Sequence, residues 1–217
     1  MQENFIMLTD IESIDHTIEI VEEYLSLFPD EKERIHKLIE ALHCAKEKSH
    51  CYLSDLYESN SSTAHITASA VILTEEDNIF QIHHNAINKW LNPGGHAEKT
   101  DANTYQTARR ELSEETGVND PVYKPLRDKN PLLPFDIDCH EIPLNKTKRK
   151  DKHWHLDFRY LFVVDKLQVD NAALKLDEVQ KARIITIDNL LLEDPKNVLL
   201  LKLRILIENM GKMSIFE

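Results

Sequence analysis

The spacing of apolar residues changes near His65, and this change constrains the fold more than any other feature of the chain. Over residues 10–28 apolar side chains recur at intervals of three and four, which is the pattern of an amphipathic helix. After His65 the chain has short runs rich in β-branched residues, separated by polar segments, which is typical of strands. We therefore expect a helical extension over residues 1–57 and a main domain over residues 58–217.

The extension is predicted to be a helical hairpin. Its first helix should stop at Pro29, because proline disrupts a helix interior. Asp30, followed three residues later by Glu33, has the spacing of a capping box at the start of a second helix. The apolar stripes of both helices must be buried. The sequence leaves open whether they pack on the main domain, act as a lid or join two copies in a homodimer.

The main domain alternates between predicted strands and predicted helices. The predicted strands are "ITASAVIL", "IFQIH", "FDIDCHEI", "HWHLDFRYLFVV" and "ARIITI". A helix is expected from Asn103 to Glu115, with Gly117 at or just past its end. Residues 190–209 should be mostly helical, with Pro195 starting a second part. Strands interleaved with helices indicate a layered α/β or α+β domain.

Composition narrows the class of partner. The chain is 41% hydrophobic and 29% charged, as in a globular protein with a proper core. It has no membrane-length apolar run and no secretory leader, so we expect a cytoplasmic protein without a membrane partner. The formal charge of −12 argues against nucleic acid. A phosphorylated small molecule remains compatible, because a bound divalent cation reverses the local sign. The basic run from Asn145 to Lys152 is predicted to be a solvated loop or a phosphate-holding flap.

The stretch "RRELSEETGV" places three glutamates, Glu111, Glu114 and Glu115, close together on one predicted helix. Like charges three and four residues apart repel each other, so the cluster makes chemical sense when a cation lies against it. Magnesium prefers oxygen ligands and usually binds a few carboxylates together with substrate phosphates. Arg110 is placed to pair with a carboxylate and orient it. An exposed acidic helix face is the alternative interpretation.

The same stretch, behind a Gly-Gly turn, resembles the signature of the Nudix hydrolase family. That signature is Gly, five residues, Glu, seven residues, then Arg-Glu-apolar-X-Glu-Glu-X-Gly-apolar, and its second half is complete in residues 110–118. The resemblance implies an α/β/α sandwich with a mixed sheet. It also implies magnesium- or manganese-dependent cleavage of a nucleoside diphosphate linked to another group. Metal ligands would be Gly95 and the three glutamates; catalytic roles would fall to Arg110, Glu114 and Glu115.

The first half of the signature departs from the family pattern. Counting forward from Gly95, the expected Glu position holds Asp101, and counting back from Arg110 it holds Ala102. The chain therefore has one extra residue between these anchors. One interpretation is an insertion absorbed at the turn before the helix, with Asp101 or Glu98 taking the place of the acid. The other is a weakened metal site.

The resemblance extends from the second helix to near Ile187 and is greatest to a bacterial subgroup whose signature begins "GGHAD". Further substrate contacts are predicted on "HWHLDFRY", where His155, Asp157 and Arg159 alternate along a strand and so point the same way. Asp101 is the other predicted substrate-binding residue. "DIDCH" repeats the alternation with Asp136, Asp138 and His140.

Three functions compete at this point. The first is a metal-dependent pyrophosphohydrolase, in which water attacks one phosphorus of a diphosphate. The second is a Nudix-fold module that binds a nucleotide without turning it over, which the extra residue before the helix would favour. The third is isomerase chemistry of the isopentenyl diphosphate type on the same fold, for which Cys139 is the only candidate catalytic thiol in the main domain.

Overall fold

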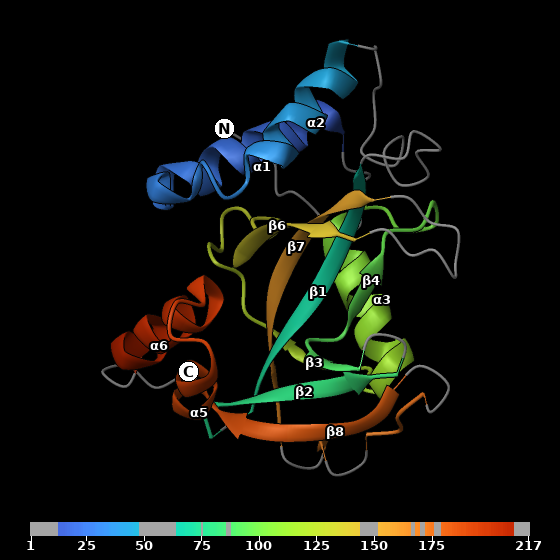
Figure 1. The fold of residues 1–217 in the computed structure, drawn as a ribbon, viewed down its shortest axis with the longest axis vertical. Coiled ribbons are helices and arrows are strands. Elements are labelled where there is room, and N and C mark those ends of the chain that lie inside the picture. The colour runs from blue at the N-terminus through green and yellow to red at the C-terminus, as the bar shows by residue number, and fades with distance from the viewer. Residues whose placement is uncertain are drawn as a thin grey trace.

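The structure is a computed structural model in which eight strands form one mixed sheet with helices on both of its faces (Figure 1). It describes residues 13–47, 64–74, 76–85, 88–143, 152–165, 168–169, 172–175 and 179–210. The predicted basic run up to residue 151 lies outside the described residues, as do the ends of the predicted extension.

The described helices and strands follow one another in an order that begins with the hairpin and ends with two helices. The helices are α1 Ile14–Leu27, the short 3-10 helix η1 Pro29–Glu31, α2 His36–Glu47, α3 Thr104–Thr116, α5 Ile187–Glu193 and α6 Val198–Met210. The strands are β1 Ala64–Thr74, β2 Asn78–His84, β3 Lys89–Leu91, β4 Gly94–His96, β5 Val122–Tyr123, β6 Asp136–Ile142, β7 His153–Val164 and β8 Val179–Thr186.

The sheet is organised around the parallel pair β1 and β7, which are in register from Ala64 with Trp154 to Thr74 with Val164. The main order is β3-β2-β1-β7-β5. Strand β8 pairs with β2, β4 with β1 and β6 with β7, all antiparallel. The sheet is therefore mixed, as expected, and all five predicted strands are confirmed. The short strands β3, β4 and β5 were not predicted, since runs of two or three residues carry no periodicity.

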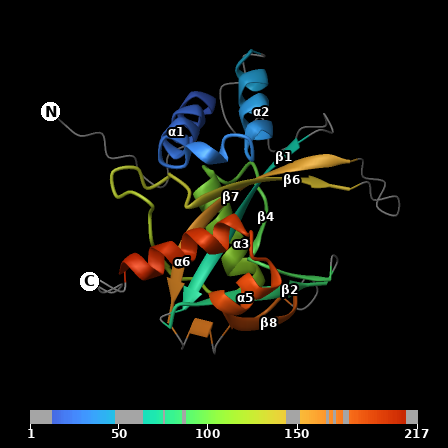
Figure 2. The same ribbon diagram turned by 60° about the vertical axis from the view of Figure 1, so that its left-hand side comes forward.

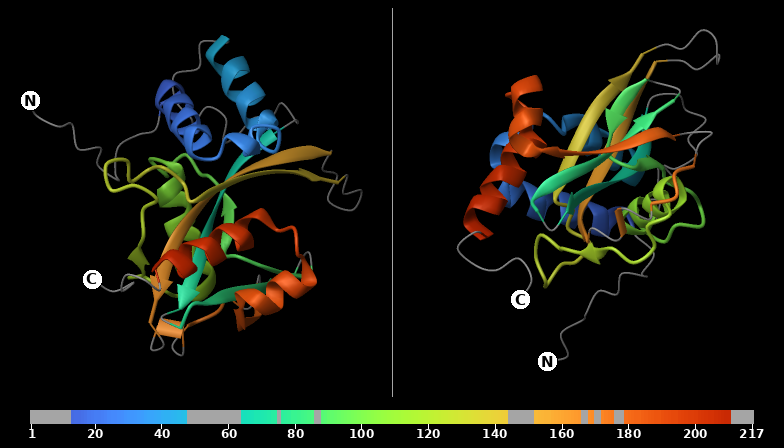
Figure 3. Two further views of the ribbon diagram at one scale, coloured as in Figure 1. Left: turned by 90° about the vertical axis from the view of Figure 1, so that its left-hand side faces the viewer. Right: turned by 90° about the horizontal axis from the view of Figure 1, so that it is seen from below.

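Each face of the sheet has its own apolar core. On one face, Ile66, Phe158 and Tyr160 pack with α3 and with the N-terminal hairpin. On the other face, Val71 and Leu161 pack with α5 and α6. The view from below shows α3 on one side of the sheet and the two C-terminal helices on the other (Figure 3). This arrangement is an α/β/α sandwich, because strand residues alternate between the two faces.

The N-terminal hairpin packs on its own main domain. Ile20, Tyr24 and Leu38 are at most 1% exposed and belong to the same apolar cluster as the sheet. Figure 2 shows α1 and α2 side by side above the end of the sheet. The predicted capping box is wrong: Asp30 lies within η1 and α2 begins only at His36. The polar residues of this turn are instead used in contacts with the sheet, described below.

The C-terminal helical prediction is confirmed with a shifted break. Residues 194–197 separate α5 from α6, so the second helix begins at Val198 rather than at Pro195. Thr186 caps α5 by accepting a hydrogen bond from the backbone N–H of Asn189. Every helix among the described residues is too short or too polar to span a bilayer.

Candidate active site

Helix α3 carries the glutamate cluster, and its ends are fixed by local sequence. Asn103 accepts a hydrogen bond from the backbone N–H of Gln106 at the N-terminus, as asparagine commonly does at this position. Gly117 ends the helix in the left-handed conformation with φ 72°, which glycine adopts without a steric penalty. Leu112 and Ala108 are fully buried against the sheet. The helix is therefore held in a fixed rotation about its axis.

The two glycines that were predicted to form a turn lie in strand β4, directly against two of the glutamates. The backbone N–H of Gly94 donates to Oε2 of Glu115 at 2.9 Å. A β-carbon on Gly95 would lie 2.3 Å from Oε1 of Glu111, so any side chain at this position would push the Glu111 carboxylate away. Glycine at position 95 is thus required for the carboxylate of Glu111 to approach the strand. Together these contacts fix Glu111 and Glu115 at one end of β4, while Glu114 is 47% exposed.

Arg110 binds three carboxylates at once. Its guanidinium donates to both oxygens of Asp101, at 3.1 and 2.9 Å, and to Oε1 of Glu111 at 2.9 Å. A longer contact of 3.4 Å reaches Glu114, and the backbone carbonyl of His96 accepts at 3.0 Å. The guanidinium therefore reduces the repulsion within the acidic cluster. Burial alone would lower the pKa of Arg110, but the neighbouring carboxylates outweigh burial and raise it.

Asp101 is an internal partner of Arg110. It is 7% exposed, and it also accepts hydrogen bonds from the hydroxyl of Thr107 at 2.9 Å and from the backbone N–H of Glu98 at 3.0 Å. Burial raises the pKa of Asp101, but the hydrogen bonds from Arg110 outweigh it and lower the pKa. The extra residue lies in the turn that Asp101 closes on Glu98. The arrangement agrees with an insertion absorbed before the helix.

The donors at this end of α3 fit a hard divalent cation. These donors are carboxylate oxygens; the side chain of Glu111 is 14% exposed and that of Glu114 is 47% exposed. Magnesium binds through one or two carboxylates together with waters and phosphates. The absence of a side chain at Gly95 lets the carboxylate of Glu111 lie against the backbone of β4. Within the described part of the chain, no three His, Cys, Asp or Glu side chains already converge on a common point.

A wall of polar side chains covers part of β1, β7 and β6 on the face of the sheet opposite α3. Asp157 is 4% exposed and accepts from the hydroxyls of Ser69 at 2.9 Å and Thr67 at 3.1 Å. Arg159 donates to Asp157 at 2.8 Å. Because Ser69 is registered with Gly94, the wall adjoins the two glycines. The predicted alternation along β7 is confirmed, and the contacts of Asp157 and Arg159 are to neighbouring side chains.

His155 lies in a cluster of imidazole rings at the far end of the same wall. Its ring centroid is 4.9 Å from that of His96, 5.2 Å from His153 and 5.5 Å from His140. His65 lies 4.7 Å from His153. The Nε2 atom of His155 is buried without a hydrogen-bond partner in the described structure. Burial, with the neighbouring imidazoles, lowers the pKa of His155 to about 3.

Cys139 lies on the face of the sheet that α3 covers, opposite the polar wall. It packs in the cluster formed with α3 and the hairpin, and burial raises the pKa of its thiol to about 12. A thiol of that pKa forms little thiolate near neutral pH. Cys139 is therefore a poor nucleophile, and the isomerase interpretation loses support.

Sequence reasoning missed several residues that contact the wall. Ser69 and Thr67 are ordinary members of a predicted strand, and no feature of "ITASAVIL" distinguishes them. Arg34 and Lys202 reach the wall from the hairpin and from α6, far away in the sequence. A lone basic residue on a helix carries no positional signal, so only the folded chain reveals them. An open cavity of about 460 Å³ beside α3, lined by Arg109 and Arg110 among others, was likewise not predicted.

Comparison with known proteins agrees with this geometry. The family model of the NUDIX domain matches residues 63–202. A probable DHNTP pyrophosphohydrolase of Lactococcus lactis subsp. cremoris (strain MG1363) is 36% identical over 109 residues, which is 50% of this chain and 60% of that protein. The chain thus matches less than two thirds of that relative's length.

A solved structure shows a similar fold. A NUDIX-family hydrolase from Clostridium perfringens is similar with a TM-score of 0.50 and 19% identity, over 65% of this chain and 97% of that one. The Ap4A hydrolase of C. elegans, in a binary complex, gives a TM-score of 0.48 and 13% identity, over 68% and 98% of the two chains. The matched family model covers more than half of the sequence, including β1, α3 and β7. The chain belongs to the NUDIX domain family.

Proposed function

We propose that the protein is a pyrophosphohydrolase that uses Mg²⁺ or Mn²⁺ to cleave a diphosphate bond in a nucleotide-type small molecule. The observation that carries this proposal is the close approach of Glu111 to Gly95 beside Glu115, which the N–H of Gly94 holds. An acidic helix face with no chemical role would not need glycine at this contact. The bound cation would neutralise the negative charge of both the glutamates and the substrate phosphates.

The glutamates of α3 are assigned different roles according to how far each side chain is buried. Glu111, Glu114 and Glu115 would hold the cation, with Gly95 offering backbone to it. A bound divalent cation lowers the pKa of a water ligand and neutralises charge on phosphate oxygens. Glu114 is 47% exposed, so we assign to it the acceptance of a proton from the attacking water. Glu115 is 2% exposed and keeps its position through Gly94.

Arg110 would act by orienting carboxylates rather than by touching the phosphate. Its guanidinium already bridges Asp101 and Glu111, and a planar guanidinium fixes the geometry of such contacts. Asp101 therefore supports Arg110 and is not our candidate for direct substrate contact. His155, Asp157 and Arg159 remain the proposed substrate-binding residues, since they line the polar wall that adjoins the two glycines.

The substrate class is taken from the family and the relative. We propose a nucleoside diphosphate linked to another moiety, and we include DHNTP because the Lactococcus relative is named a probable DHNTP pyrophosphohydrolase. The net charge of −12 makes nucleic acid an unsuitable partner. A cytoplasmic location and a homodimer remain predictions.

The test is turnover of a panel containing DHNTP, nucleoside triphosphates, ADP-ribose, dinucleoside polyphosphates and nucleotide sugars, with Mg²⁺ and with Mn²⁺. Wild type would be compared with Glu114→Gln and, as a matched control, Glu208→Gln on α6, where the side chain is 68% exposed. We expect cation-dependent turnover that falls at least 100-fold in Glu114→Gln and is unchanged in Glu208→Gln. Equal turnover in all three proteins would refute the assignment.

A second candidate is a binding module that holds a nucleotide without hydrolysing it. The observation favouring it is that Arg110 bridges Glu111 and Glu114, where it competes with a cation for the same oxygens. Calorimetric binding of a panel compound without turnover under either metal would support this function instead.

A further inference from the structure

Charged side chains from four separate elements meet around the start of β6. Asp136 is fully buried, and its Oδ1 accepts from Arg34 at 2.7 Å and from Lys202 at 2.8 Å. Arg34 lies in the turn before α2, and Lys202 lies on α6. Tyr24 of α1 donates to the same oxygen at 3.2 Å. The backbone N–H of Ile137 in turn donates to the Tyr24 hydroxyl at 3.1 Å.

Two aspartates of β6 connect Arg34 to Arg159. Asp136 accepts from Arg34 at Oδ1 and from Arg159 at Oδ2, at 2.7 and 3.1 Å. Asp138 repeats the pattern, with Arg34 at 3.2 Å on Oδ1 and Arg159 at 2.9 Å on Oδ2. Each carboxylate is therefore held from both sides, and its orientation toward Arg159 depends on the guanidinium of Arg34. Glu31 forms an ion pair with Arg34 and helps to hold its guanidinium in place.

The contacts continue from Arg159 to the glutamate helix. Arg159 donates to Asp157 at 2.8 Å, and Asp157 accepts from the hydroxyl of Ser69 at 2.9 Å. The Ser69 hydroxyl lies so close to Gly94 that a β-carbon there would be 2.5 Å away. Gly94 in turn holds Glu115 through its N–H. A line of contacts thus runs from the N-terminal hairpin to the candidate metal site: it is polar as far as Ser69, and Ser69 packs directly against Gly94.

The loss of Arg34 would change the balance of positive and negative charge around Arg159. Arg159 is surrounded by three carboxylates, those of Asp136, Asp138 and Asp157. Removing one partner from a buried ion pair leaves a carboxylate that must find new compensation. Asp136 would keep Lys202, whereas Asp138 would keep only Arg159 and His140. Asp138 would therefore turn toward Arg159 and displace it relative to Asp157.

We propose that Arg34 is a positioning residue of the active site: it sets Arg159 through the two β6 aspartates and, through Asp157 and Ser69, the strand that holds Glu115. The matched family model begins at residue 63, so this contribution comes from outside the part of the chain that the family shares. The hairpin is then a fixed component of the site rather than a separate module. The effect on catalysis rests on the proposed function, whereas the positioning itself does not.

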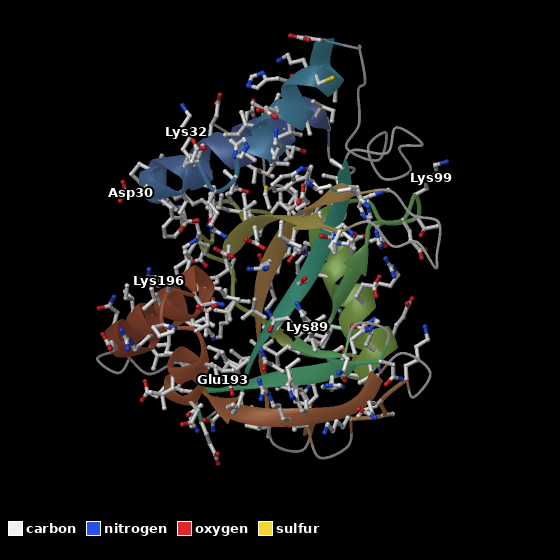
Figure 4. All side chains as sticks on the ribbon, in the orientation of Figure 1. Asp30, Lys32, Lys89, Lys99, Glu193 and Lys196 are labelled. Atoms are coloured by element: carbon white, nitrogen blue, oxygen red, sulfur yellow. The ribbon has the colours of Figure 1, made fainter. Side chains whose placement is uncertain are left out.

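The first test needs no substrate. Backbone and arginine-Nε NMR spectra would be compared for wild type, Arg34→Met, Arg34→Lys and the control Lys32→Met, whose side chain is exposed two residues away (Figure 4). We expect Arg34→Met to shift the resonances of Arg159 Nε and of the Gly94 amide. We expect Lys32→Met to leave both unchanged. If Arg34→Met does not fold, Arg34→Lys keeps one positive charge and can engage one aspartate, so it should shift the same resonances to a lesser extent.

The second test measures kcat and KM separately on the best substrate of the panel. We expect Arg34→Met to raise KM at least fivefold, with a smaller change in kcat, and Arg34→Lys to recover part of the loss. In an Asp157→Asn background the effect of Arg34→Met should shrink, because the line of contacts is already broken. A folded Arg34 variant whose Gly94 amide is unchanged overturns the positioning role. A shifted Gly94 amide in a protein that hydrolyses nothing in the panel would instead refute only the proposed function.

Discussion

A β-carbon at position 95 would collide with the end of a flexible side chain, whereas one at position 94 would collide with backbone. Gly95→Ala meets the carboxylate of Glu111, while Gly94→Ala meets the carbonyl of Ala68 at 2.7 Å. We expect Gly95→Ala to keep its stability but lose roughly 10- to 100-fold in metal affinity or activity. Gly94→Ala should lose about 1–3 kcal/mol of stability. Thermal unfolding and activity would be measured for both variants. Equal melting temperatures would contradict the distinction between the two positions.

His155 gives the molecule a pH dependence of predictable sign. Its pKa of about 3 in the folded protein lies below the value near 6.5 of an unfolded chain. Between these values the unfolded chain binds a proton that the folded one does not, so stability falls as the pH decreases. The effect between pH 7 and pH 5 is up to about 2 kcal/mol.

His155→Gln should therefore flatten the decrease in unfolding free energy between pH 7 and pH 5, while His43→Gln at an exposed position on α2 serves as the control. Urea denaturation at the two pH values measures the difference. An NMR titration in which the His155 ring protonates near pH 6 would contradict the prediction.

At the scale of the element, α3 depends on its N-terminal cap. Asn103 is fully buried and accepts from the N–H of Gln106 at 3.0 Å. Asn103→Ala should cost about 1 kcal/mol of stability, and Asn103→Ser should restore most of it because serine also caps helices. Chemical denaturation measures both. Identical stability of the alanine and serine variants would show that the cap is not the source of the effect.

The elements show how far the sequence could be interpreted. The limits of α3 were predictable to one residue, because Asn103 and Gly117 are strong local signals, and the long strands were predictable from their alternation. The second hairpin helix was misplaced, because Asp30 and Glu33 imitate a capping box while Glu31 and Arg34 are committed to tertiary contacts. Local helix propensity is overridden where charged residues distant in the sequence form contacts with the same side chains.

The candidate site divides in the same way. The glutamates and Arg110 lie within one helical stretch, and the resemblance of that stretch to the Nudix signature, rather than the acidic spacing alone, made them the predicted site. The contacts of Asp101 with Arg110 could not be predicted by counting along the signature, because the extra residue left its place in the pattern ambiguous. Arg34 and Lys202 come from opposite ends of the chain. No spacing rule connects them to Asp136, because their proximity is a property of the sheet and its two layers of helices.

At the scale of the molecule, the hairpin and the sheet share one core. A chain starting at Ser59 would expose the apolar surface that Ile20, Tyr24 and Leu38 cover and would leave Asp136 without Arg34. We expect this truncated protein to aggregate or to unfold without a cooperative transition. Size-exclusion chromatography with light scattering and thermal unfolding would measure this. A soluble truncated protein with a sharp transition near that of the full chain would refute the shared core.

The long parallel pairing of β1 with β7 also determines when the chain can fold. Ala64 pairs with Trp154 and Thr74 with Val164. Strand β1 therefore cannot pair with β7 until the ribosome has synthesised that much later segment. Until then β1 has an unpaired edge, and its apolar side chains lack the cover that β7 and the later helices provide. Pairings between residues so distant in sequence form slowly, and exposed strands of this kind favour aggregation. The nascent protein is therefore most vulnerable while the ribosome is still translating the region between β1 and β7.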